Sequence, residues 1–392
     1  MPKKKISIIA DNSKNEGGAN IAAKRICRIL KKNYHINQIQ PLRNSFFFST
    51  KNIFTKILVK LFIGQTPFLN SINLFDNIDL KKITGEILSI HWIGKNTISI
   101  KSLEKIQIPI IWTLHDMWPI TSTEHFLDIY NEIGYNTKNL NNNFLKKKLF
   151  DQKKKLFKNK KIYLVTCCRW LERIAKKSEI SKNLKIVTIY NPIETSLWNR
   201  KNQSICKDKL RLDNKKNYIL FGAQGGLSNP RKGGDLLIKI INRVKEFLIR
   251  NDYEIIILGG KENHVSYDYD VKLHFRKHEK NIQRQILYHS AVNLTLSCSK
   301  AEALPQFLVE TLLCKNPVVS FNVGGINEII SHKKNGFLVK PFNIDDFCEG
   351  IKFVINNKKR LQVDDKINYL KTEFNEINFL KKYHKLINSI TK

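Results

Sequence analysis

The chain has 392 residues, 42% of them hydrophobic and 10% aromatic, a composition typical of a folded globular protein long enough for two domains. No apolar run approaches the roughly 20 residues that cross a bilayer, and the apolar N-terminal stretch is too short for a signal peptide, which favours a cytoplasmic location. The formal charge of +34 indicates attraction to an anion, although compositional drift toward lysine and asparagine would give the same charge.

The first half of the chain alternates short apolar segments with amphipathic or polar ones, the pattern of a parallel sheet covered by helices. A Gly17-Gly18 turn precedes an amphipathic helix that we expect from Ala19 to about Lys32. The expected strands are Lys5–Ala10, Ile87–Trp92, Ile108–Leu114, Ile162–Cys167 and Ile186–Tyr190.

A second series of the same kind follows a polar segment, residues 196–216, which we expect to be a hinge. The expected strands and helices alternate, which predicts a second parallel sheet with helices on both faces. The strands are Tyr218–Gly222, Glu254–Leu258, Val292–Leu296, Pro317–Phe321 and Phe337–Val339, and the helices are Asp235–Phe247, Ile282–His289, Pro305–Cys314 and Asp345–Ile355.

The predicted fold class is therefore α/β, with two doubly wound Rossmann-like domains. The N-terminal domain covers residues 1–195 and the C-terminal domain residues 217–372. A final helix over residues 373–392 is expected, with packing back on the N-terminal domain as one option. Because ligands of such sheets bind beyond the carboxyl ends of the strands, both domains are expected to face a cleft between them.

Zinc and nucleic acid are not the expected partners. None of the seven cysteines forms a CxxC pair, so neither a zinc site nor a disulfide framework is predicted. Lysines are spread over the whole chain and no nucleic-acid motif appears. We expect reduced and mostly buried thiols at positions 27, 167, 168, 206, 298, 314 and 348.

A glycine-rich loop follows the first strand of the second half. Residues 221–234 contain Arg231 and Lys232, and these side chains suit a diphosphate because arginine binds it in a bidentate way and lysine adds a point charge. The Gly-Lys-Ser/Thr order of a Walker loop is absent. A solvated turn with incidental charge is the alternative interpretation.

Two glutamates, Glu302 and Glu310, flank Pro305, a residue that suits the first turn of a helix. The amides at the start of that helix, in Gln306, Phe307 and Leu308, are then expected to point at an anion. In this interpretation Glu310 accepts both ribose hydroxyls of a nucleotide-sugar and Glu302 holds hydroxyls of the sugar. The alternative is two ordinary glutamates, one capping the helix and one in a surface ion pair.

Several segments of the second half, taken in order, resemble the retaining glycosyltransferases of family 4. They are Arg231–Gly233, Ser299–Glu302, Glu310, Asn316–Val319, Gly324–Glu328 and Asn335–Val339. The resemblance extends over nearly the whole chain. It implies a GT-B fold, a nucleotide-sugar bound by the C-terminal domain, and retention of the anomeric configuration.

The first half resembles a subgroup of that family that builds bacterial surface polysaccharides, through residues 113–119 (TLHDMWP). The resemblance implies that His115 lies near the transferred sugar. It also implies that Gly17-Gly18 is the turn at which the backbone approaches the donor diphosphate, since glycine has no side chain and tolerates positive φ. A packed histidine and a plain tight turn are the alternatives.

Two departures from the family pattern affect these expectations. Ala223 and Gln224 stand where many relatives have an arginine, so the diphosphate is expected to depend more on Arg231 and Lys232. Residues 121–125 (TSTEH) stand where the subgroup often has Thr-Gly-Gly-Cys-His, so the acceptor is not inferred from relatives.

The segment 144–161 is rich in lysine and has one apolar stripe at helical spacing. A basic amphipathic helix can lie on anionic lipid, which makes peripheral contact with a membrane one expectation. A helix packed on the core, with a solvated lysine face, is the alternative.

The expected function is a hexosyltransferase-type glycosyltransferase that moves a sugar from a nucleotide diphosphate to a growing, lipid-linked cell-surface glycan. No cofactor or metal is expected, because Arg231, Lys232 and the helix N-terminus take the place of a divalent ion. The alternatives are a catalytically degenerate basic protein that binds membrane or nucleic acid, and a related enzyme that uses a sugar phosphate or water as acceptor. The expected catalytic residues are His115, Arg231, Lys232 and Glu302, and the expected donor-binding residues are Gly17, Gly18, Arg231, Lys232, Glu302, Gln306, Phe307, Leu308 and Glu310.

Overall fold

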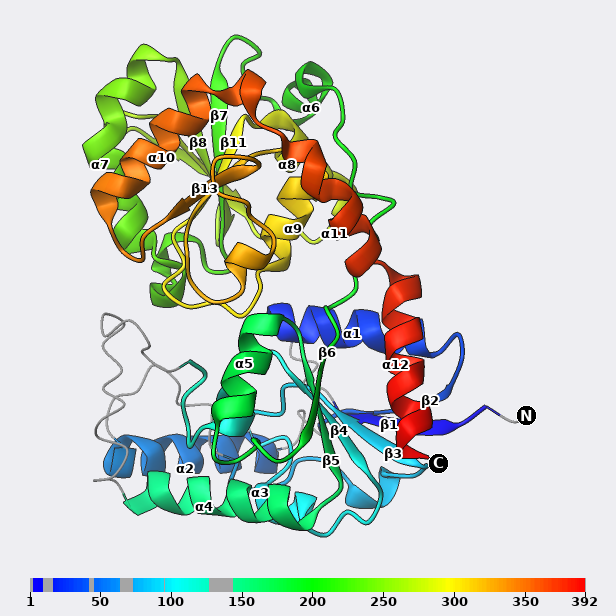
Figure 1. Cartoon of the computed structure of the whole chain (residues 1–392). Helices are drawn as coiled ribbons and strands as arrows, with labels where there is room; N and C mark the ends of the chain where they lie inside the picture. The colour runs from blue at the N-terminus through cyan, green and yellow to red at the C-terminus, as the bar shows by residue number, and fades with distance from the viewer. Residues whose placement is uncertain are drawn as a thin grey trace. The chain divides into compact units, whose positions relative to one another are not determined.

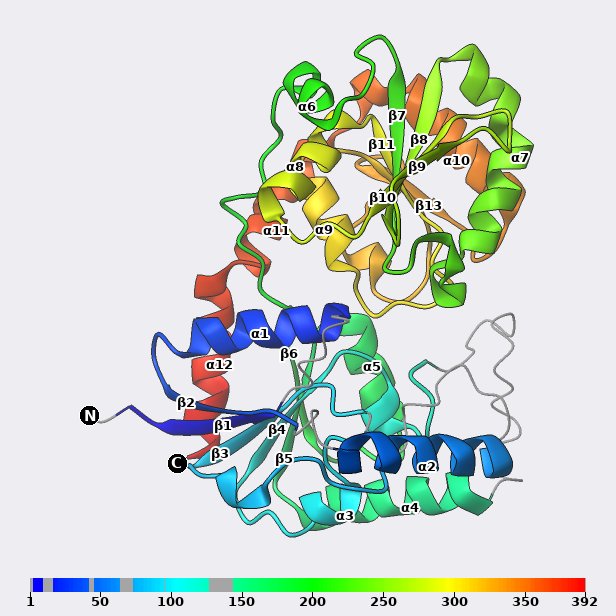
Figure 2. The ribbon, with the colours of Figure 1, turned by 180° about the vertical axis from the view of Figure 1, so that it is seen from behind.

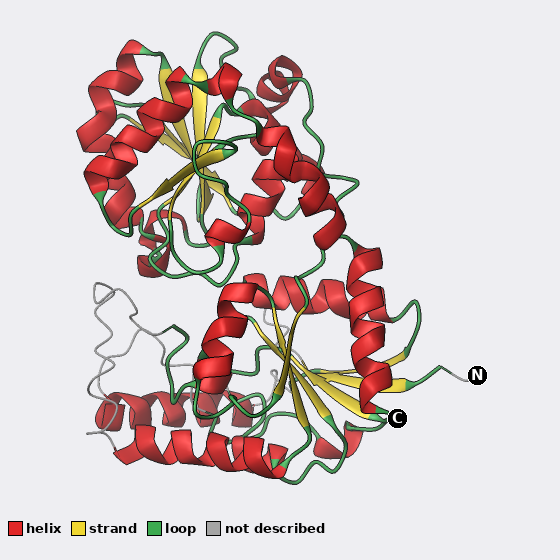
Figure 3. Cartoon of the chain, in the orientation of Figure 1, coloured by secondary structure: helices red, strands yellow, loops and turns green. Residues whose placement is uncertain are grey.

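The computed structural model describes residues 3–9, 17–41, 46–63, 73–94, 96–126 and 144–391. The chain forms two compact units, one made of Met1–Pro192 together with Glu376–Lys392 and the other of Ile193–Asn375 (Figure 1). In both units strands lie between helices, as an α/β fold requires (Figure 3). The chain passes from one unit to the other twice, after Pro192 and after Asn375.

The N-terminal unit contains a six-stranded sheet in the order β2-β1-β3-β4-β5-β6, and every neighbouring pair is parallel. The strands consist mostly of β-branched and apolar residues, and those of β3 and β4 are buried throughout. Their bounds are Lys5–Ile9 (β1), His35–Ile39 (β2), Ile87–Ile90 (β3), Ile110–Leu114 (β4), Ile162–Thr166 (β5) and Lys185–Thr188 (β6).

Helices cover both faces of this sheet. The helices α2, α3 and α4 lie together on the side of the sheet away from α1 in both views (Figures 1 and 2). On that side Trp112 of β4 contacts Phe157 of α4, with ring centroids 5.6 Å apart. The helices are Gly18–Leu30 (α1), Phe46–Ile63 (α2), Ile100–Leu103 (α3), Phe144–Asn159 (α4), Arg169–Lys177 (α5) and Glu376–Ile390 (α12).

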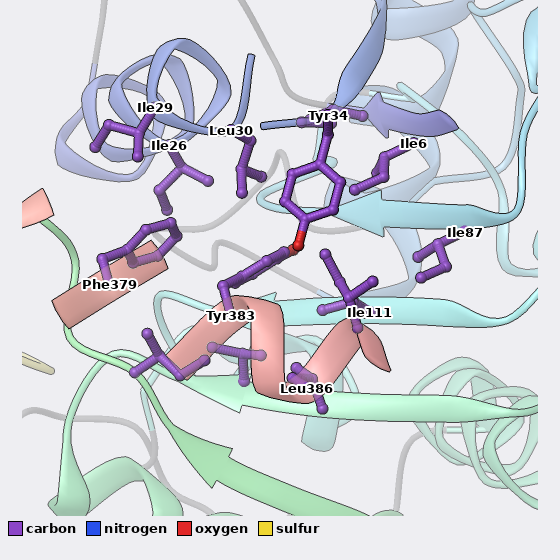
Figure 4. Packing of buried hydrophobic residues seen from close by; sticks show 14 of the residues in the cluster. Ile6, Ile26, Ile29, Leu30, Tyr34, Ile87, Ile111, Phe379, Tyr383 and Leu386 are labelled. Atoms are coloured by element: carbon purple, nitrogen blue, oxygen red, sulfur yellow. The ribbon is translucent and has the colours of Figure 1, made fainter. Parts of the chain in front are cut away.

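The helix α12, at the C-terminal end of the chain, completes the core of the N-terminal unit. Its residues Phe379, Tyr383 and Leu386 pack against Ile6 of β1 and Ile26 of α1, all in one buried cluster (Figure 4). The Tyr383 hydroxyl also lies 3.0 Å from the Ser89 hydroxyl. Residues separated by most of the sequence therefore share one core.

The C-terminal unit contains a seven-stranded sheet in the order β13-β12-β11-β7-β8-β10-β9. The edge strand β9 is antiparallel to its neighbour, and the other pairs are parallel. The bounds are Asn217–Gly222 (β7), Tyr253–Gly260 (β8), His264–Ser266 (β9), Leu273–Lys277 (β10), Leu294–Ser297 (β11), Val318–Phe321 (β12) and Gly336–Val339 (β13). The two doubly wound sheets predicted from the sequence are confirmed, and the strands β2, β9 and β10 are additions to the prediction.

The helices α7 and α10 lie on one side of this sheet, and α8 and α9 on the other (Figures 1 and 2). Residues 196–216, expected to be a hinge, contain α6 and belong to this unit. Cys206 and Leu210, one helical turn apart, bury α6 against the core around Tyr218. The helices are Gln203–Leu210 (α6), Gly234–Arg250 (α7), Ile282–Ala291 (α8), Gln306–Leu313 (α9), Ile344–Asn356 (α10) and Ile367–Glu373 (α11).

The seven cysteines are all buried and none is in a disulfide. Within the described ranges, no helix combines the length and the apolar character needed to cross a bilayer.

Candidate functional site

The strand order of the C-terminal unit identifies the ligand-binding edge of its sheet. From β7 the chain continues to β8 on one side, and it later returns to β11 on the other side of β7. Ligands of doubly wound sheets bind beyond the carboxyl ends of the strands, where the order reverses in this way. The two loops at that point are residues 223–233, after β7, and residues 298–305, after β11.

A buried carboxylate joins these two loops. Glu302 accepts hydrogen bonds from Arg231 (3.1 Å), Ser299 (3.1 Å) and Lys232, all at the same oxygen, Oε1. Arg231 Nη1 also donates to the Ala301 carbonyl at 2.9 Å. The structure therefore brings together three of the predicted catalytic residues, and Oε2 of Glu302 takes part in none of these three bonds.

The charges of this cluster stabilise one another. Burial by itself would raise the pKa of the Glu302 carboxyl, but Lys232 and Arg231 together with the hydrogen bonds lower that pKa to about 2. The Glu302 side chain is 9% exposed, whereas those of Lys232 and Arg231 are 19% and 30% exposed. The Glu302 carboxylate thus stays ionised and holds the two partly exposed cations, Arg231 and Lys232, at the ligand-binding edge.

Glycines allow the loops of this edge to approach one another closely. Gly233 has a φ of +70°, and a Cβ there would lie 2.0 Å from the Cys298 carbonyl oxygen. Gly324, in the loop after β12, has a φ of +61°, and a Cβ there would lie 1.7 Å from the Glu302 carbonyl oxygen. Positive φ and close backbone contact both require glycine at these two positions.

The helix α9 begins next to this cluster, with Pro305 as its N-cap. The Leu308 amide donates to the Pro305 carbonyl at 3.1 Å, and the Leu308 side chain is buried in the core. The Phe307 ring packs over Gly222, where a Cβ would lie 2.1 Å from the ring. The side chains of Phe307 and Leu308 therefore have packing roles, and the prediction for these residues concerned their backbone amides.

Two polar side chains of α9 remain candidates for ligand contact. The side-chain nitrogen Nε2 of Gln306 is buried without a hydrogen-bond partner in the part of the chain that the structure describes. Glu310 lies about one turn further along α9 and is half-buried. The predicted role of Gln306 concerned its backbone amide, so the side-chain nitrogen is an additional candidate, and Glu310 keeps its predicted role as a proposal.

The N-terminal unit places His115 at the carboxyl end of β4. His115 Nε2 lies 3.1 Å from Nδ1 of His91, which follows β3, and the two rings are stacked. Asn191 Nδ2 is 3.5 Å from the other ring nitrogen of His115. Burial lowers the pKa of His115 to about 4, while the Asp116 charge acts in the opposite direction, so the imidazole is neutral near pH 7.

Gly17 and Gly18 lie at the start of α1. Gly17 is the N-cap with a φ of −75°, and neither glycine has a positive φ. A Cβ on Gly18 would meet no atom within 4 Å. The expectation that positive φ matters at this turn is therefore wrong, and what remains is an open approach to the backbone.

A folded loop follows His115 and contains residues that the sequence did not single out. Asp116 Oδ2 pairs with His125 Nδ1 at 2.6 Å, and the His125 ring stacks on Trp92. Lys153 of α4 lies under the loop, with its side chain buried. Burial lowers the pKa of Lys153, while the charges of Glu124 and Asp116 act in the opposite direction.

No three His, Cys, Asp or Glu side chains within the described ranges gather as the ligands of a metal ion would. The cations at the ligand-binding edge are supplied by Arg231 and Lys232.

The stability of this cluster is expected to depend on pH. The folded-state pKa of Glu302 lies below its ordinary value of 4.5, at about 2. The ionised carboxylate therefore contributes fully to the free energy of unfolding above pH 4.5, and this contribution is lost as pH falls through the folded-state pKa. The unfolding free energy of the wild type, relative to Glu302→Gln, is expected to fall by about 2 kcal/mol between pH 6 and pH 3. Urea unfolding of both proteins at the two pH values measures the difference, and a difference that does not change with pH would contradict an ionised Glu302.

Comparisons with known proteins agree with this architecture. Residues 202–368 match the family of glycosyl transferases group 1. A protein of Haemophilus influenzae described as an uncharacterized glycosyltransferase is 26% identical over 226 residues, which are 53% of this chain and 62% of that protein. A poly(ribitol-phosphate) alpha-N-acetylglucosaminyltransferase of Staphylococcus aureus is 27% identical over 141 residues, which are 33% of this chain and 27% of that protein. The matched regions thus span less than two thirds of either relative.

Solved structures share the fold over the whole length. Sucrose-phosphate synthase from Thermosynechococcus elongatus gives a TM-score of 0.72 at 13% identity and covers 99% of each chain. HepE of Anabaena, solved in complex with UDP-glucose, gives a TM-score of 0.65 at 15% identity, covering 98% of this chain and 100% of that one. The fold is that of the GT-B glycosyltransferases, and residues 202–368 are similar to the glycosyl transferases group 1 family.

Proposed function

We propose that this protein is a retaining glycosyltransferase that moves a sugar from a nucleotide diphosphate to a growing, lipid-linked cell-surface glycan. The observation that carries the proposal is the Arg231–Lys232–Glu302 cluster at the carboxyl ends of β7 and β11, inside the region similar to the group 1 family. UDP-glucose is bound by HepE, which has the same fold. The Staphylococcus aureus relative supports a surface polymer as the acceptor class.

In this proposal Arg231 and Lys232 bind the diphosphate and stabilise the negative charge that develops on it as the sugar leaves. Their positions are fixed in advance by Glu302 and by the Ala301 carbonyl. Preorganised charge of this kind commonly contributes more to catalysis than any other effect, because no reorganisation is needed during the reaction. The amides at the start of α9 add partial positive charge, and no metal ion is required.

The remaining predicted residues have these proposed roles. Glu310 accepts hydrogen bonds from the ribose hydroxyls, and Glu302 binds sugar hydroxyls through Oε2 while Oε1 holds the cations. His115 is neutral near pH 7, and its Nδ1 exchanges the long 3.5 Å contact with Asn191 Nδ2 for a hydrogen bond from a sugar hydroxyl, without adding charge. Gly18 leaves the backbone open to the diphosphate, and Gly17 precedes it as the N-cap of α1.

We also propose peripheral contact with an anionic membrane through residues 144–161. The apolar residues Leu149, Leu156 and Phe157 of α4 are buried in the N-terminal unit, so this stripe cannot insert into lipid. The exposed lysines of the helix can still bind anionic headgroups by charge alone. They are Lys147, Lys148, Lys154, Lys155 and Lys158. The proposed location is cytoplasmic, at the inner face of the membrane.

A donor screen tests the proposed function. The purified protein is incubated with a panel of UDP-, GDP- and dTDP-sugars and with bacterial lipid extract, and products are identified by mass spectrometry. The expected result is one glycosylated lipid product with release of the nucleotide diphosphate. Absence of nucleotide binding by calorimetry, together with tight and salt-sensitive binding to RNA or anionic vesicles, would favour the alternative of a degenerate basic binding protein.

Replacing Glu310 with alanine is expected to weaken donor binding. Two hydrogen bonds to a carboxylate are lost, which corresponds to about 2 kcal/mol, or about a thirtyfold rise in the dissociation constant for UDP. Isothermal titration with UDP measures the effect. Glu349→Ala is the matched control, because Glu349 is an exposed helical glutamate of the same unit that pairs only at the surface with Lys352. Equal UDP affinity in both variants would remove Glu310 from the site.

A further inference from the structure

Lys153 differs from the other lysines of α4 because its side chain is buried, with an exposed fraction of 1%. Its ammonium donates three hydrogen bonds, to the carbonyl oxygens of Trp118 (2.6 Å), Thr121 (3.0 Å) and Ser122 (2.9 Å). An ammonium group has three N–H donors, so all of its donors are used. The ammonium also lies 3.8 Å from the centroid of the Trp118 ring, a favourable cation–π arrangement.

The three carbonyls belong to the loop of residues 116–126, which has little regular structure of its own. It contains the short 3-10 helix η2, Trp118–Ile120, and internal bonds such as those from Thr121 Oγ1 to the Glu124 carbonyl and from the Met117 amide to the His125 carbonyl. Other groups of the loop are held by side chains from neighbouring helices. Ser178, just after α5, donates to the Ile120 carbonyl at 2.9 Å, and Lys146 of α4 pairs with Glu124 at 3.0 Å. Buried carbonyls without donors are costly, so the ammonium is a main determinant of the loop conformation.

The two ends of the loop bring the side chains of Asp116 and His125 together beyond the carboxyl end of a strand in the N-terminal sheet. The loop leaves β4 at its carboxyl end, and β4 is a neighbour of β3, the strand that lies beside β1 where the strand order reverses. Asp116 and His125, at the two ends of the loop, are 2.6 Å apart, and their side chains are 14% and 11% exposed. The Met117 amide donates to the His125 carbonyl at 2.8 Å, which holds the two ends together. A carboxylate, an imidazole and the neighbouring Trp92 ring suit the hydroxyls and the apolar face of a saccharide.

We propose that Lys153 is a positioning residue for a saccharide acceptor. Its buried ammonium is an internal cation that stabilises the conformation of the loop of residues 116–126. The loop in turn fixes the Asp116–His125 pair at which the acceptor binds. The part that concerns the acceptor rests on the proposed glycosyltransferase function. The ordering of the loop by the ammonium does not depend on it.

Substitution of Lys153 with methionine tests the proposal, because methionine keeps most of the stem volume and removes the N–H donors. Amide hydrogen exchange is expected to become faster within residues 116–126 and to stay unchanged elsewhere. The kcat/KM for transfer to bacterial lipid extract is expected to fall about a hundredfold, because a displacement of a substrate-positioning group by about 1 Å typically slows a reaction by that factor. The affinity for UDP is expected to stay the same, since the proposed donor residues Arg231, Lys232 and Glu310 lie in the other unit.

Chemical rescue separates positioning from a general contribution to stability. In Lys153→Ala, propylammonium is expected to restore loop protection and transfer, because it supplies the missing carbons and the N–H donors. Tetramethylammonium, a cation without N–H donors, is expected to restore neither. The matched control is Lys154→Met, which removes an exposed lysine of the same helix that pairs with Glu179 at the surface.

A measurement on the wild type does not depend on any variant. Reductive methylation of the folded protein, mapped by mass spectrometry, is expected to modify Lys154 and Lys155 and to leave Lys153 protected. Methylation of Lys153 at the same rate as Lys154 would overturn the proposal, and so would unchanged loop exchange in Lys153→Met. Global unfolding of both Lys153 variants without rescue would assign Lys153 to folding and would also overturn it. If the wild type transfers no sugar but propylammonium still restores the loop in Lys153→Ala, the proposed function fails and the role of the ammonium stands.

Discussion

Replacing Lys232 with alanine is expected to slow sugar transfer about a hundredfold, the equivalent of about 3 kcal/mol of transition-state stabilisation. The ammonium is held at the rim of the ligand-binding edge by Glu302 before any ligand binds. Its attraction to the diphosphate grows as the leaving group gains charge, so the loss is expected mainly in kcat. Glu302 keeps its hydrogen bonds from Arg231 and Ser299 in the variant, so the loop is expected to persist.

The measurement is kcat at saturating donor, together with UDP affinity by calorimetry. Affinity for UDP is expected to change much less than kcat. Lys245→Ala is the matched control, because Lys245 is a partly exposed lysine of α7 that pairs with Asp270 at the surface. A kcat for Lys232→Ala equal to that of the control would falsify the assignment of Lys232 to the leaving group.

Replacing Gly324 with alanine is expected to destabilise the C-terminal unit by about 3 kcal/mol. The backbone there has a φ of +61°, which is strained for alanine, and the new Cβ would lie 1.7 Å from the Glu302 carbonyl oxygen. The obstructing atom belongs to the backbone, so no side-chain rotation relieves the contact. Because the loop that must move carries Glu302, donor affinity is expected to fall together with stability.

Thermal unfolding measures this effect, with an expected decrease of roughly 10 °C in Tm for a unit of this size. Gly260→Ala is the control at the same end of the sheet, because a Cβ at Gly260 would lie at ordinary contact distances of 3.7 and 3.9 Å. If the Tm of Gly324→Ala instead lies within about 2 °C of the control value, the loops that carry Gly324 and Glu302 are less tightly packed than the structure indicates.

The fold was predictable wherever the sequence carries a strong local pattern. The continuous apolar strands and the amphipathic helices between them indicated the class of both sheets, because such strands must be buried on both faces. Strand order is not a local property, so the position of β7 between β8 and β11 had to come from the structure. The strand β9 lies at the edge of the sheet with β10 beside it, and both carry exposed residues such as His264 and Lys277, which hides the apolar pattern.

The candidate site was predictable in part. Arg231 and Lys232 stand out in the sequence as cations beside glycines, and Glu302 stands out as a glutamate shortly before Pro305. The structure brings the three residues together. Their mutual pairing was not predicted, because it depends on two loops that are distant in the sequence. Lys153 could not be distinguished from the other lysines of α4, since burial of a lysine depends on the loop folded over it.

The contribution of α12 to the N-terminal core has a consequence for biosynthesis. The residues that complete this core, Phe379, Tyr383 and Leu386 among them, leave the ribosome only after the whole of Ile193–Asn375. The second unit can therefore fold during translation while the first still exposes Ile6 and Ile26. A fragment that stops at residue 192 would keep that apolar face uncovered and would be prone to aggregation. An N-terminal fragment for separate study therefore needs residues 376–392, joined by a linker or supplied as a peptide.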